Sequence, residues 1–329
     1  MEIKICHNPA YSVILGQNIY PQLFDFYNGE CSEVVFLVDA AHYQKTSEFF
    51  TQYPIFPIDQ SCQPINIDTL AKLAIQLKQS GISAAALLVV VGDEKLQGLG
   101  TFLAATYQTG LRFIAVPTTT YSQINPRINS PYFLDSPQEK QLFGSQKPAE
   151  MILSDIDFLS LLKEKQFHDG LYVALLKALL FDQQLLETLE HPQYKQQIIE
   201  IIKVSLAYKS LLNNPEYSEL RHLFNPDESI YRLWPNWPFA PGETLFYQIL
   251  PFIENREILS RLKNLTSSWG FSLRPTLDFS KMSEEIIKKK ATNQSISCII
   301  IKDYQKWSTI SLELGEFISR VQKNEQSNW

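Results

Sequence analysis

The sequence predicts a two-domain protein in which an α/β domain with a mostly parallel sheet is followed by a mainly helical domain. In the first half of the 329 residues, short apolar runs alternate with helical patterns, and this order is typical of βαβ units. In the second half, strand signals nearly vanish and helical periodicity dominates. The change falls near Asp155, so we expect the two domains to span residues 1–155 and 156–329.

Three apolar runs in the first half are expected to form parallel strands, because strands that are buried on both faces carry unbroken apolar stretches. These runs are Val34–Val38, Ala84–Val91 and Phe113–Val116. Between the first two runs we expect a helix that is capped by Asp68 and closed by Gly81. A second helix is expected over Leu99–Tyr107. The first domain is therefore predicted to be Rossmann-like.

Helical segments are expected to make up most of the second half. These segments are Phe158–Leu162, Leu171–Leu189 and Ile198–Leu212. A single late strand is expected at Ser297–Ile301. The stretch Trp234–Gly242 is rich in proline and is predicted to be a loop, because an interior proline removes a helical hydrogen bond.

Composition excludes several classes of protein. The chain is 45% apolar with a net charge of −6, which excludes dominant disorder and argues against nucleic-acid binding through clustered Lys and Arg. Its longest apolar run, Ala84–Val91, is far shorter than the roughly 20 residues that cross a bilayer. The cysteines are far apart, at Cys6, Cys31, Cys62 and Cys298. This usage favours a reducing compartment, and we expect a cytoplasmic protein.

Ligands of open parallel sheets bind beyond the carboxyl ends of the strands, and four residues of interest lie at such ends. Asp39 ends the first expected strand and suits either a ribose hydroxyl or a helix cap. Thr118 and Thr119 follow the third strand, where they could offer hydroxyls to phosphate or ribose, or simply cap the strand end. Gly92 follows the second strand, but the two acids after it would repel an anion. NAD binding is therefore left open.

The histidines do not predict a metal site. They are His7, His42, His168, His191 and His222. No two of them are three or four residues apart, so a two-histidine zinc site cannot form within one helix.

The segment Phe102–Thr119 resembles the 3-dehydroquinate synthases, which carry Phe-x-Ala-Ala-Thr-Tyr-x-Arg-Gly, an apolar strand and then Pro-Thr-Thr. Thr109 stands in the place of the arginine. Further similar segments follow in the same order, at Glu139–Gly144, Ser154–Leu159, Phe167–Leu171, Leu220–Asn225 and Gly242–Glu243. The resemblance covers nearly the whole chain and implies the same order of two domains.

This resemblance implies a homodimeric lyase that uses zinc and NAD to release phosphate from a seven-carbon sugar acid phosphate. In the family, one Glu and two His hold a zinc ion that polarises the hydroxyl and the ketone, and Lys and Arg hold the phosphate and the carboxylate. The positions that match these zinc ligands are Val173, Glu228 and Pro241. Val173 and Pro241 have no side-chain ligand atom, so zinc is not expected here.

The family's glycine-rich nucleotide loop falls at residues 92–98, where acids replace two of the glycines. Four matches to substrate contacts are retained, at Lys140, Lys203, Arg221 and Asn225. The match at Lys203 requires an insertion at Asn213–Glu216. For Arg221 and Asn225, structural hydrogen bonds between helices are the favoured alternative. The four residues together are interpreted as a remnant of an anion-binding site.

Three hypotheses follow. The leading one is a homodimeric dehydroquinate-synthase-like pseudoenzyme with a binding or scaffold role, a small anionic ligand near Lys140 and Arg221, and no nucleic-acid or membrane partner. The second is a divergent 3-dehydroquinate synthase or related sugar phosphate cyclase with a rebuilt site that draws on Glu228, Glu243, Lys140 and Arg221. The third is a nicotinamide-binding oxidoreductase of related fold, which the two acids after Gly92 argue against.

Overall fold

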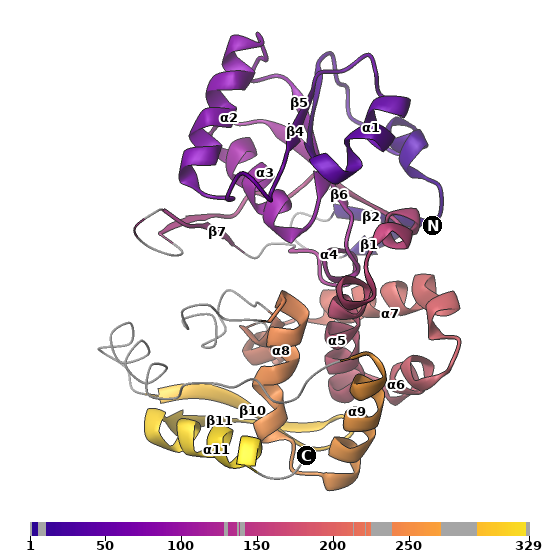
Figure 1. The fold of residues 1–329 in the computed structure, drawn as a ribbon, viewed down its shortest axis with the longest axis vertical. Coiled ribbons are helices and arrows are strands. Elements are labelled where there is room, and N and C mark those ends of the chain that lie inside the picture. The colour runs from indigo at the N-terminus through magenta and orange to yellow at the C-terminus, as the bar shows by residue number, and fades with distance from the viewer. Residues whose placement is uncertain are drawn as a thin grey trace. The chain divides into compact units, whose positions relative to one another are not determined.

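The computed structural model describes residues 2–5, 11–127, 131–136, 138, 142–212, 214–220, 222–224, 239–270 and 295–326. The chain divides into two units, Met1–Leu162 and Lys163–Trp329, and each is described by itself (Figure 1). The sequence placed the division after Asp155. The first unit extends further because the 3-10 turn η3 (Ile156–Leu161) returns Phe158 to the core of that unit.

A seven-stranded sheet with the order β1-β2-β9-β6-β5-β3-β4 forms the centre of the first unit. Its strands are β1 (Glu2–Ile5), β2 (Tyr11–Gly16), β3 (Val34–Asp39), β4 (Ile55–Ile58), β5 (Leu87–Gly92), β6 (Arg112–Pro117) and β9 (Met151–Asp155). The six strands from β2 to β4 pair in parallel, and β1 pairs antiparallel with β2 at the edge. The carboxyl ends of the parallel strands therefore meet at one edge of the sheet.

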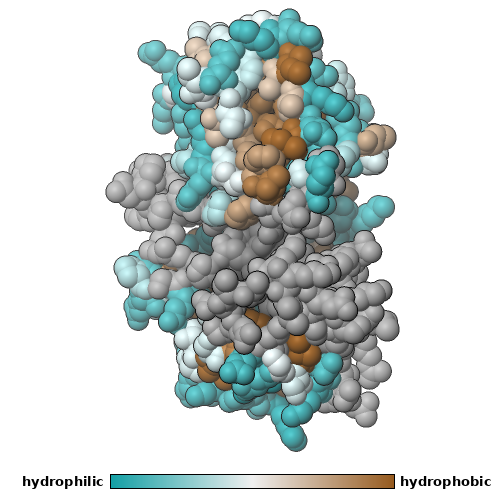
Figure 2. All heavy atoms as spheres, turned by 90° about the vertical axis from the view of Figure 1, so that its left-hand side faces the viewer, coloured by the Kyte–Doolittle hydropathy of each residue, from teal (hydrophilic) through white to brown (hydrophobic). Residues whose placement is uncertain are grey.

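Helices and turns cover both faces of this sheet. The elements are η1 (Tyr20–Asp25), η2 (Ala40–His42), α1 (Tyr43–Phe49), α2 (Ile67–Gln79), α3 (Glu94–Thr106) and α4 (Thr120–Ile124). On one face, α2 and α3 share a core with side chains such as Val90 and Phe113. On the other, η1 and the end of α1 share a core with Phe36 and Val89. Figure 2 shows a band of apolar side chains on the outer surface of this unit.

A short hairpin adds to the first unit outside the main sheet. It consists of β7 (Tyr132–Leu134) and β8 (Phe143–Ser145), which pair antiparallel. Both strands contact α3. Leu134 belongs to the same core as α2 and α3, so the hairpin extends the apolar layer on that face of the sheet.

The three strands that the sequence predicts are confirmed as β3, β5 and β6, with shifted bounds. The shift is largest in β5, which begins at Leu87 and not at Ala84. The three alanines before Leu87 form a turn instead, in which the Ala86 N–H donates to the Ser83 carbonyl oxygen at 3.3 Å. Short alanine runs fit a turn as well as a strand, so the apolar pattern overstated the strand.

The two predicted helices of the first unit exist, but both begin elsewhere than expected. The cap of α2 is Asn66, whose side chain accepts from the Thr69 N–H, and Asp68 lies in the first turn. Gly81 follows the end of α2 with a φ of +78°, as its predicted closing role requires. The second helix, α3, begins five residues before Leu99, because Asp93 caps it.

The second unit is mainly helical, as predicted. Its helices and turns are α5 (Glu164–Phe181), α6 (Gln183–Glu190), η4 (Tyr194–Gln197), α7 (Ile198–Leu211), η5 (Pro215–Leu220), η6 (His222–Phe224), α8 (Pro241–Ile249), η9 (Leu250–Phe252), α9 (Arg256–Ser268) and α11 (Leu314–Gln326). The late strand is confirmed as β10 (Ser295–Asp303), which pairs antiparallel with β11 (Lys306–Glu313). Among the described residues, none of the helices is long and apolar enough to cross a membrane.

Two local predictions for the second unit are wrong. The expected single helix over Leu171–Leu189 is broken at Asp182, which ends α5 and caps α6 by accepting from the N–H groups of Gln184 and Leu185. The expected loop over Trp234–Gly242 ends earlier, because α8 begins at Pro241, and proline fits the first turn of a helix. The earlier part of that stretch, residues 234–238, lies outside the described residues.

Candidate functional site

Polar side chains from three loops meet at the carboxyl edge of the first unit's sheet. Gln60, which follows β4, donates through Nε2 to Asp39 Oδ2 at 2.7 Å and to Asp93 Oδ1 at 3.0 Å. Asp39 ends β3 and Asp93 follows β5, so the amide bridges the ends of two neighbouring strands. Both amide hydrogens of Gln60 are used in this bridge. The edge therefore presents two carboxylates held together by one neutral side chain.

Asp93 also occupies the N-terminus of α3. Its Oδ1 accepts from the backbone N–H groups of Lys95 at 3.2 Å and of Leu96 at 3.0 Å. In dinucleotide-binding domains, the N–H groups at this helix end bind the pyrophosphate, helped by the positive end of the helix dipole. Here the chain's own carboxylate takes these donors, and its charge opposes that of a phosphate.

The other predicted nucleotide contacts also take part in local structure. Asp39 Oδ1 accepts from the Ala41 N–H at 2.9 Å, so the helix-cap alternative is the one observed. Thr119 caps α4 and exchanges hydrogen bonds with Ser122. The N–H of Thr118, which is buried, donates to the Gly92 carbonyl oxygen at 3.1 Å. The roles of Asp39, Gly92, Thr118 and Thr119 in cofactor binding stay predictions.

Glu94, the first residue of α3, carries a carboxyl group that titrates near neutral pH. Burial is the main cause, and the neighbouring Asp93 charge adds to it; together they raise the pKa of Glu94 to about 7. Burial has the opposite effect on an imidazole, and it lowers the pKa of His42, which follows Asp39 in η2. Near neutral pH, the start of α3 therefore carries less negative charge than its sequence indicates.

In the second unit, two of the positions that match zinc ligands lie in the packed helices α5 and α8. Val173 is fully buried within α5, and Pro241 is the first residue of α8. The two helices approach at Gly242, where a Cβ atom would collide with the Asp169 carbonyl oxygen. Asp169 Oδ1 accepts from the Glu243 N–H at 3.0 Å, and this hydrogen bond joins the first turn of α8 to α5.

This arrangement does not fit a zinc ion. Val173 and Pro241 supply no donor atom, and the third position, Glu228, lies outside the described residues. Glu243 has partners of its own, since its Oε2 accepts from the Ala240 N–H at 3.1 Å and lies 3.5 Å from Lys165 Nζ. Within the described parts of the chain, His, Cys, Asp and Glu side chains form no group of three that could hold a metal.

Of the predicted remnant substrate contacts, only Lys203 falls within the described residues; Lys140, Arg221 and Asn225 do not. Lys203 Nζ lies 2.9 Å from Glu200 Oε2 on α7, and both side chains are largely exposed. Lys177 of α5, in contrast, is fully buried and donates to the Ser205 carbonyl oxygen at 2.9 Å. Burial holds the pKa of Lys177 well below its usual value.

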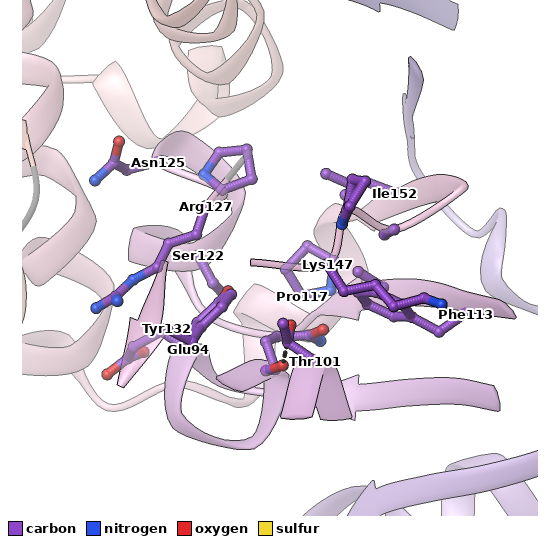
Figure 3. Close-up of a pocket in the computed structure, with 15 residues that line it drawn as sticks. Glu94, Thr101, Phe113, Pro117, Ser122, Asn125, Arg127, Tyr132, Lys147 and Ile152 are labelled. Carbon is purple, nitrogen blue, oxygen red and sulfur yellow. Dashed lines mark hydrogen bonds between the residues drawn. The ribbon is translucent and has the colours of Figure 1, made fainter. Parts of the chain in front are cut away.

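A pocket, here called the α3 pocket, opens between α3 and the face of β6 and β9 (Figure 3). Its empty space is about 550 Å³, which includes open solvent at its mouth. It is lined by Glu94, Gln97, Thr101, Phe113, Ala115, Pro117, Ser122, Asn125, Pro126, Arg127, Tyr132, Lys147, Pro148, Ala149 and Ile152. No pattern in the sequence marks Gln60 or Gln97, because an amide takes its role from contacts that are distant along the chain.

Comparison with known proteins finds similarity to one family. The family model for the N-terminal part of 3-dehydroquinate synthase matches residues 56–169. The 3-dehydroquinate synthase of Thermodesulfovibrio yellowstonii is 22% identical over 97% of this chain and 89% of its own length. That of Pelobacter propionicus is 30% identical over 38% of this chain and 35% of its own length. The chain is thus similar to 3-dehydroquinate synthases, most clearly over residues 56–169.

Solved structures share the fold of this chain over nearly its whole length. A 2-deoxy-scyllo-inosose synthase, complexed with carbaglucose-6-phosphate, NAD+ and Co2+, has a TM-score of 0.81 at 13% identity, and 98% of this chain and 99% of that chain are covered. The 2-epi-5-epi-valiolone synthase of Streptomyces hygroscopicus has a TM-score of 0.76 at 14% identity, with 97% of each chain covered. An iron-containing alcohol dehydrogenase of Corynebacterium glutamicum has a TM-score of 0.62 at 12% identity, and 95% of this chain and 94% of that chain are covered.

Proposed function

We propose that this chain is a member of the 3-dehydroquinate synthase family that does not carry out a zinc- and NAD-dependent cyclisation and acts as a binding or scaffold protein. The observation that carries this proposal is the α5–α8 junction. There, Val173 and Pro241 stand at ligand positions without a donor atom, and Gly242 packs directly on Asp169. No exchange of side-chain rotamers can supply the missing ligands at these two positions.

The N-terminus of α3 supports the part of this proposal that excludes NAD-dependent chemistry. Asp93 caps the helix and shares Gln60 with Asp39, so a pyrophosphate would meet carboxylates where it needs N–H donors. The same contacts argue against the nicotinamide-binding oxidoreductase, whose fold the alcohol dehydrogenases share at lower TM-scores.

We also propose a homodimeric, cytoplasmic protein with a small anionic ligand, which light scattering and ligand screening would test.

The size of the expected defect follows from transition-state energetics. Each tenfold change in rate corresponds to about 1.4 kcal/mol of activation free energy. A catalytic metal supplies several kcal/mol of charge stabilisation, so its loss alone removes about a thousandfold or more. Residues such as Lys203, which is paired with Glu200 on an exposed helix face, do not replace that contribution.

The decisive experiment measures phosphate release from the family's seven-carbon sugar acid phosphate, with the purified chain, NAD and either zinc or cobalt. The Thermodesulfovibrio yellowstonii relative serves as the positive control. We expect no release above the rate without protein, and calorimetric titration with NAD should give no saturable heat. Turnover that depends on the added metal would overturn the proposal and support the divergent cyclase with a rebuilt site. Of the residues suspected there, Glu243 already has structural partners, and Glu228, Lys140 and Arg221 lie outside the described residues.

A further inference from the structure

All lining residues of the α3 pocket belong to the first unit, and none of them matches a zinc-ligand position. Two of them, Glu94 and Gln97, lie in the segment that matches the family's nucleotide loop. The floor of the pocket is apolar, because Phe113 and Ala115 of β6 and Ile152 of β9 point to this face of the sheet. Their neighbours Ile114 and Met151 point to the opposite core. Ala115 is the smallest side chain of this floor, and it leaves room between α3 and the sheet.

Gln97 places an unpartnered hydrogen-bond acceptor in the wall of the pocket. Its Nε2 donates to the carbonyl oxygens of Val90 at 3.0 Å and Gly92 at 3.4 Å, which fixes the orientation of the amide because Oε1 could not take that place. Oε1 is buried and has no partner within the described residues, and the whole side chain is only 4% exposed. A buried acceptor without a donor is costly, so this atom calls for a ligand hydroxyl, an N–H group or a water.

Lys147 supplies a cation from the opposite side of the pocket. Its Nζ lies 3.3 Å from the place where a Cβ atom on Gly110 would be, and Gly110 comes just before β6. Lys147 as a residue is half-buried, and its ammonium makes no hydrogen bond or ion pair with the described residues. Figure 3 shows Lys147 apart from Glu94, which lies near the carboxyl end of β6. The two polar regions are thus separated by the apolar floor.

Arg127 and Glu94 complete the charge of the pocket. The Arg127 guanidinium lies 4.7 Å from the centre of the Tyr132 ring and donates to the Pro131 carbonyl oxygen at 3.2 Å. Burial and the Asp93 charge raise the pKa of Glu94 to about 7, so its negative charge is incomplete near neutral pH. Because Lys147 has no ion-pair partner among the described residues and the charge of Glu94 is incomplete, the pocket favours an anionic ligand.

We propose that the α3 pocket binds a small carboxylate with an apolar body and a hydroxyl donor at its far end. The carboxylate accepts from Lys147, the body lies on Phe113, Ala115 and Ile152, and the hydroxyl donates to Gln97 Oε1. From Phe113 to Pro117 the strand rises about 13 Å, which a chain of about six carbons bridges once both side chains reach inward. A polyhydroxylated sugar fits less well, because the apolar floor would leave its hydroxyls without partners.

The test uses 6-hydroxyhexanoate as the probe, with the full chain and without NAD or metal, so its outcome is separate from that of the cyclisation assay. Ligand-observed NMR titration should give saturable binding. Hexanoate, which lacks the hydroxyl, and 1-hexanol, which lacks the carboxylate, should each bind at least tenfold more weakly. Absence of saturable binding, or equal affinity for all three compounds, would overturn the proposal.

Variants assign the binding to the pocket. Lys147→Met should weaken 6-hydroxyhexanoate at least tenfold and leave 1-hexanol unchanged, while Ala115→Leu should abolish the binding of all three compounds by filling the floor. Lys78→Met, at an exposed lysine of α2, is the matched control and should bind as the wild type does. The thermal unfolding midpoint of each variant shows whether it folds. If Ala115→Leu does not fold, Lys147→Met alone decides the assignment. Wild-type affinity in Lys147→Met would contradict the assignment.

Discussion

The carboxyl edge of the first unit's sheet and the α5–α8 junction of the second unit differ in what fills them. The sequence resemblance matches the first to the nucleotide loop of the 3-dehydroquinate synthases and the second to two of their metal-ligand positions. At the sheet edge, polar side chains satisfy one another, as Asp93 does with Gln60 and with the start of α3. At the junction, apolar side chains and a backbone contact leave no donor at Val173 and Pro241.

The two regions would need changes of different size to bind a ligand. At the sheet edge, the backbone N–H groups of Lys95 and Leu96 are still present and are only occupied by a side chain. A change at Asp93 therefore frees them. At the junction, new donors at Val173 and Pro241 would have to enter a packed helix and the first turn of another. We therefore expect substitutions at the junction to affect stability most.

The largest effect is expected from Gly242→Ala. The added Cβ atom would collide with the Asp169 carbonyl oxygen, which is backbone of α5 and cannot move without shifting that helix. We expect the free energy of unfolding to fall by about 3 kcal/mol, measured by urea denaturation.

The matched control is Gly315→Ala in α11, where nothing lies within 4 Å of an added Cβ atom. It should leave stability unchanged or raise it by up to about 1 kcal/mol. If both variants were equally stable, the close approach of α5 and α8 at Gly242 would be refuted, and with it the contrast between the two regions.

A pH-dependent effect of intermediate size is expected from Lys177→Met in α5. Burial holds the pKa of Lys177 far below its usual value in the folded chain, whereas the unfolded chain keeps the usual value. Between these two values the unfolded state binds the extra proton, so wild-type stability rises with pH, by up to about 1.4 kcal/mol per pH unit. The variant should therefore have a higher free energy of unfolding than the wild type at pH 7, and this difference should be smaller at pH 9.

Urea denaturation of both proteins at the two pH values measures this gap. Lys203→Met is the control, because Lys203 is partly exposed and pairs with Glu200 on the same helix, an arrangement that contributes little. The difference in free energy of unfolding between Lys203→Met and the wild type should be the same at both pH values. A gap for Lys177→Met that widened with pH would have the wrong sign and would contradict a neutral buried lysine.

The sequence predicted those parts of the fold that depend on local pattern. The strands β3, β5 and β6 were found because both of their faces are buried and their apolar runs are continuous. In contrast, β2 and β9 were missed, although they lie in the same sheet, because polar residues such as Ser12 and Ser154 interrupt their short apolar runs. The break of the long helix at Asp182 was missed because the apolar pattern continues across it.

The candidate site was less predictable than the fold. Gln60 and Gln97 act through hydrogen bonds to residues on other elements, and no periodicity or motif in the sequence marks such contacts. Asp93 was recognised as an acid that opposes phosphate, but its capping of α3 depended on where the helix begins. Helix starts are decided by which side chain reaches the free N–H groups, and several residues near each start were able to do so.

The smallest effect is expected at the sheet edge, from Asp93→Ala. The variant loses the cap of α3 and should lower the free energy of unfolding by about 1 kcal/mol, while Asp93→Asn keeps an acceptor oxygen and should recover most of this loss. Asp68→Ala is the control, because Asp68 lies in the first turn of α2 but does not cap it, so its effect should be about 0.5 kcal/mol or less. Both Asp93 variants also remove a charge that raises the pKa of Glu94, and NMR titration should find that pKa lower in each. An unchanged Glu94 pKa would mean that burial alone sets it, and the sheet edge would then be closed by packing, as the α5–α8 junction is.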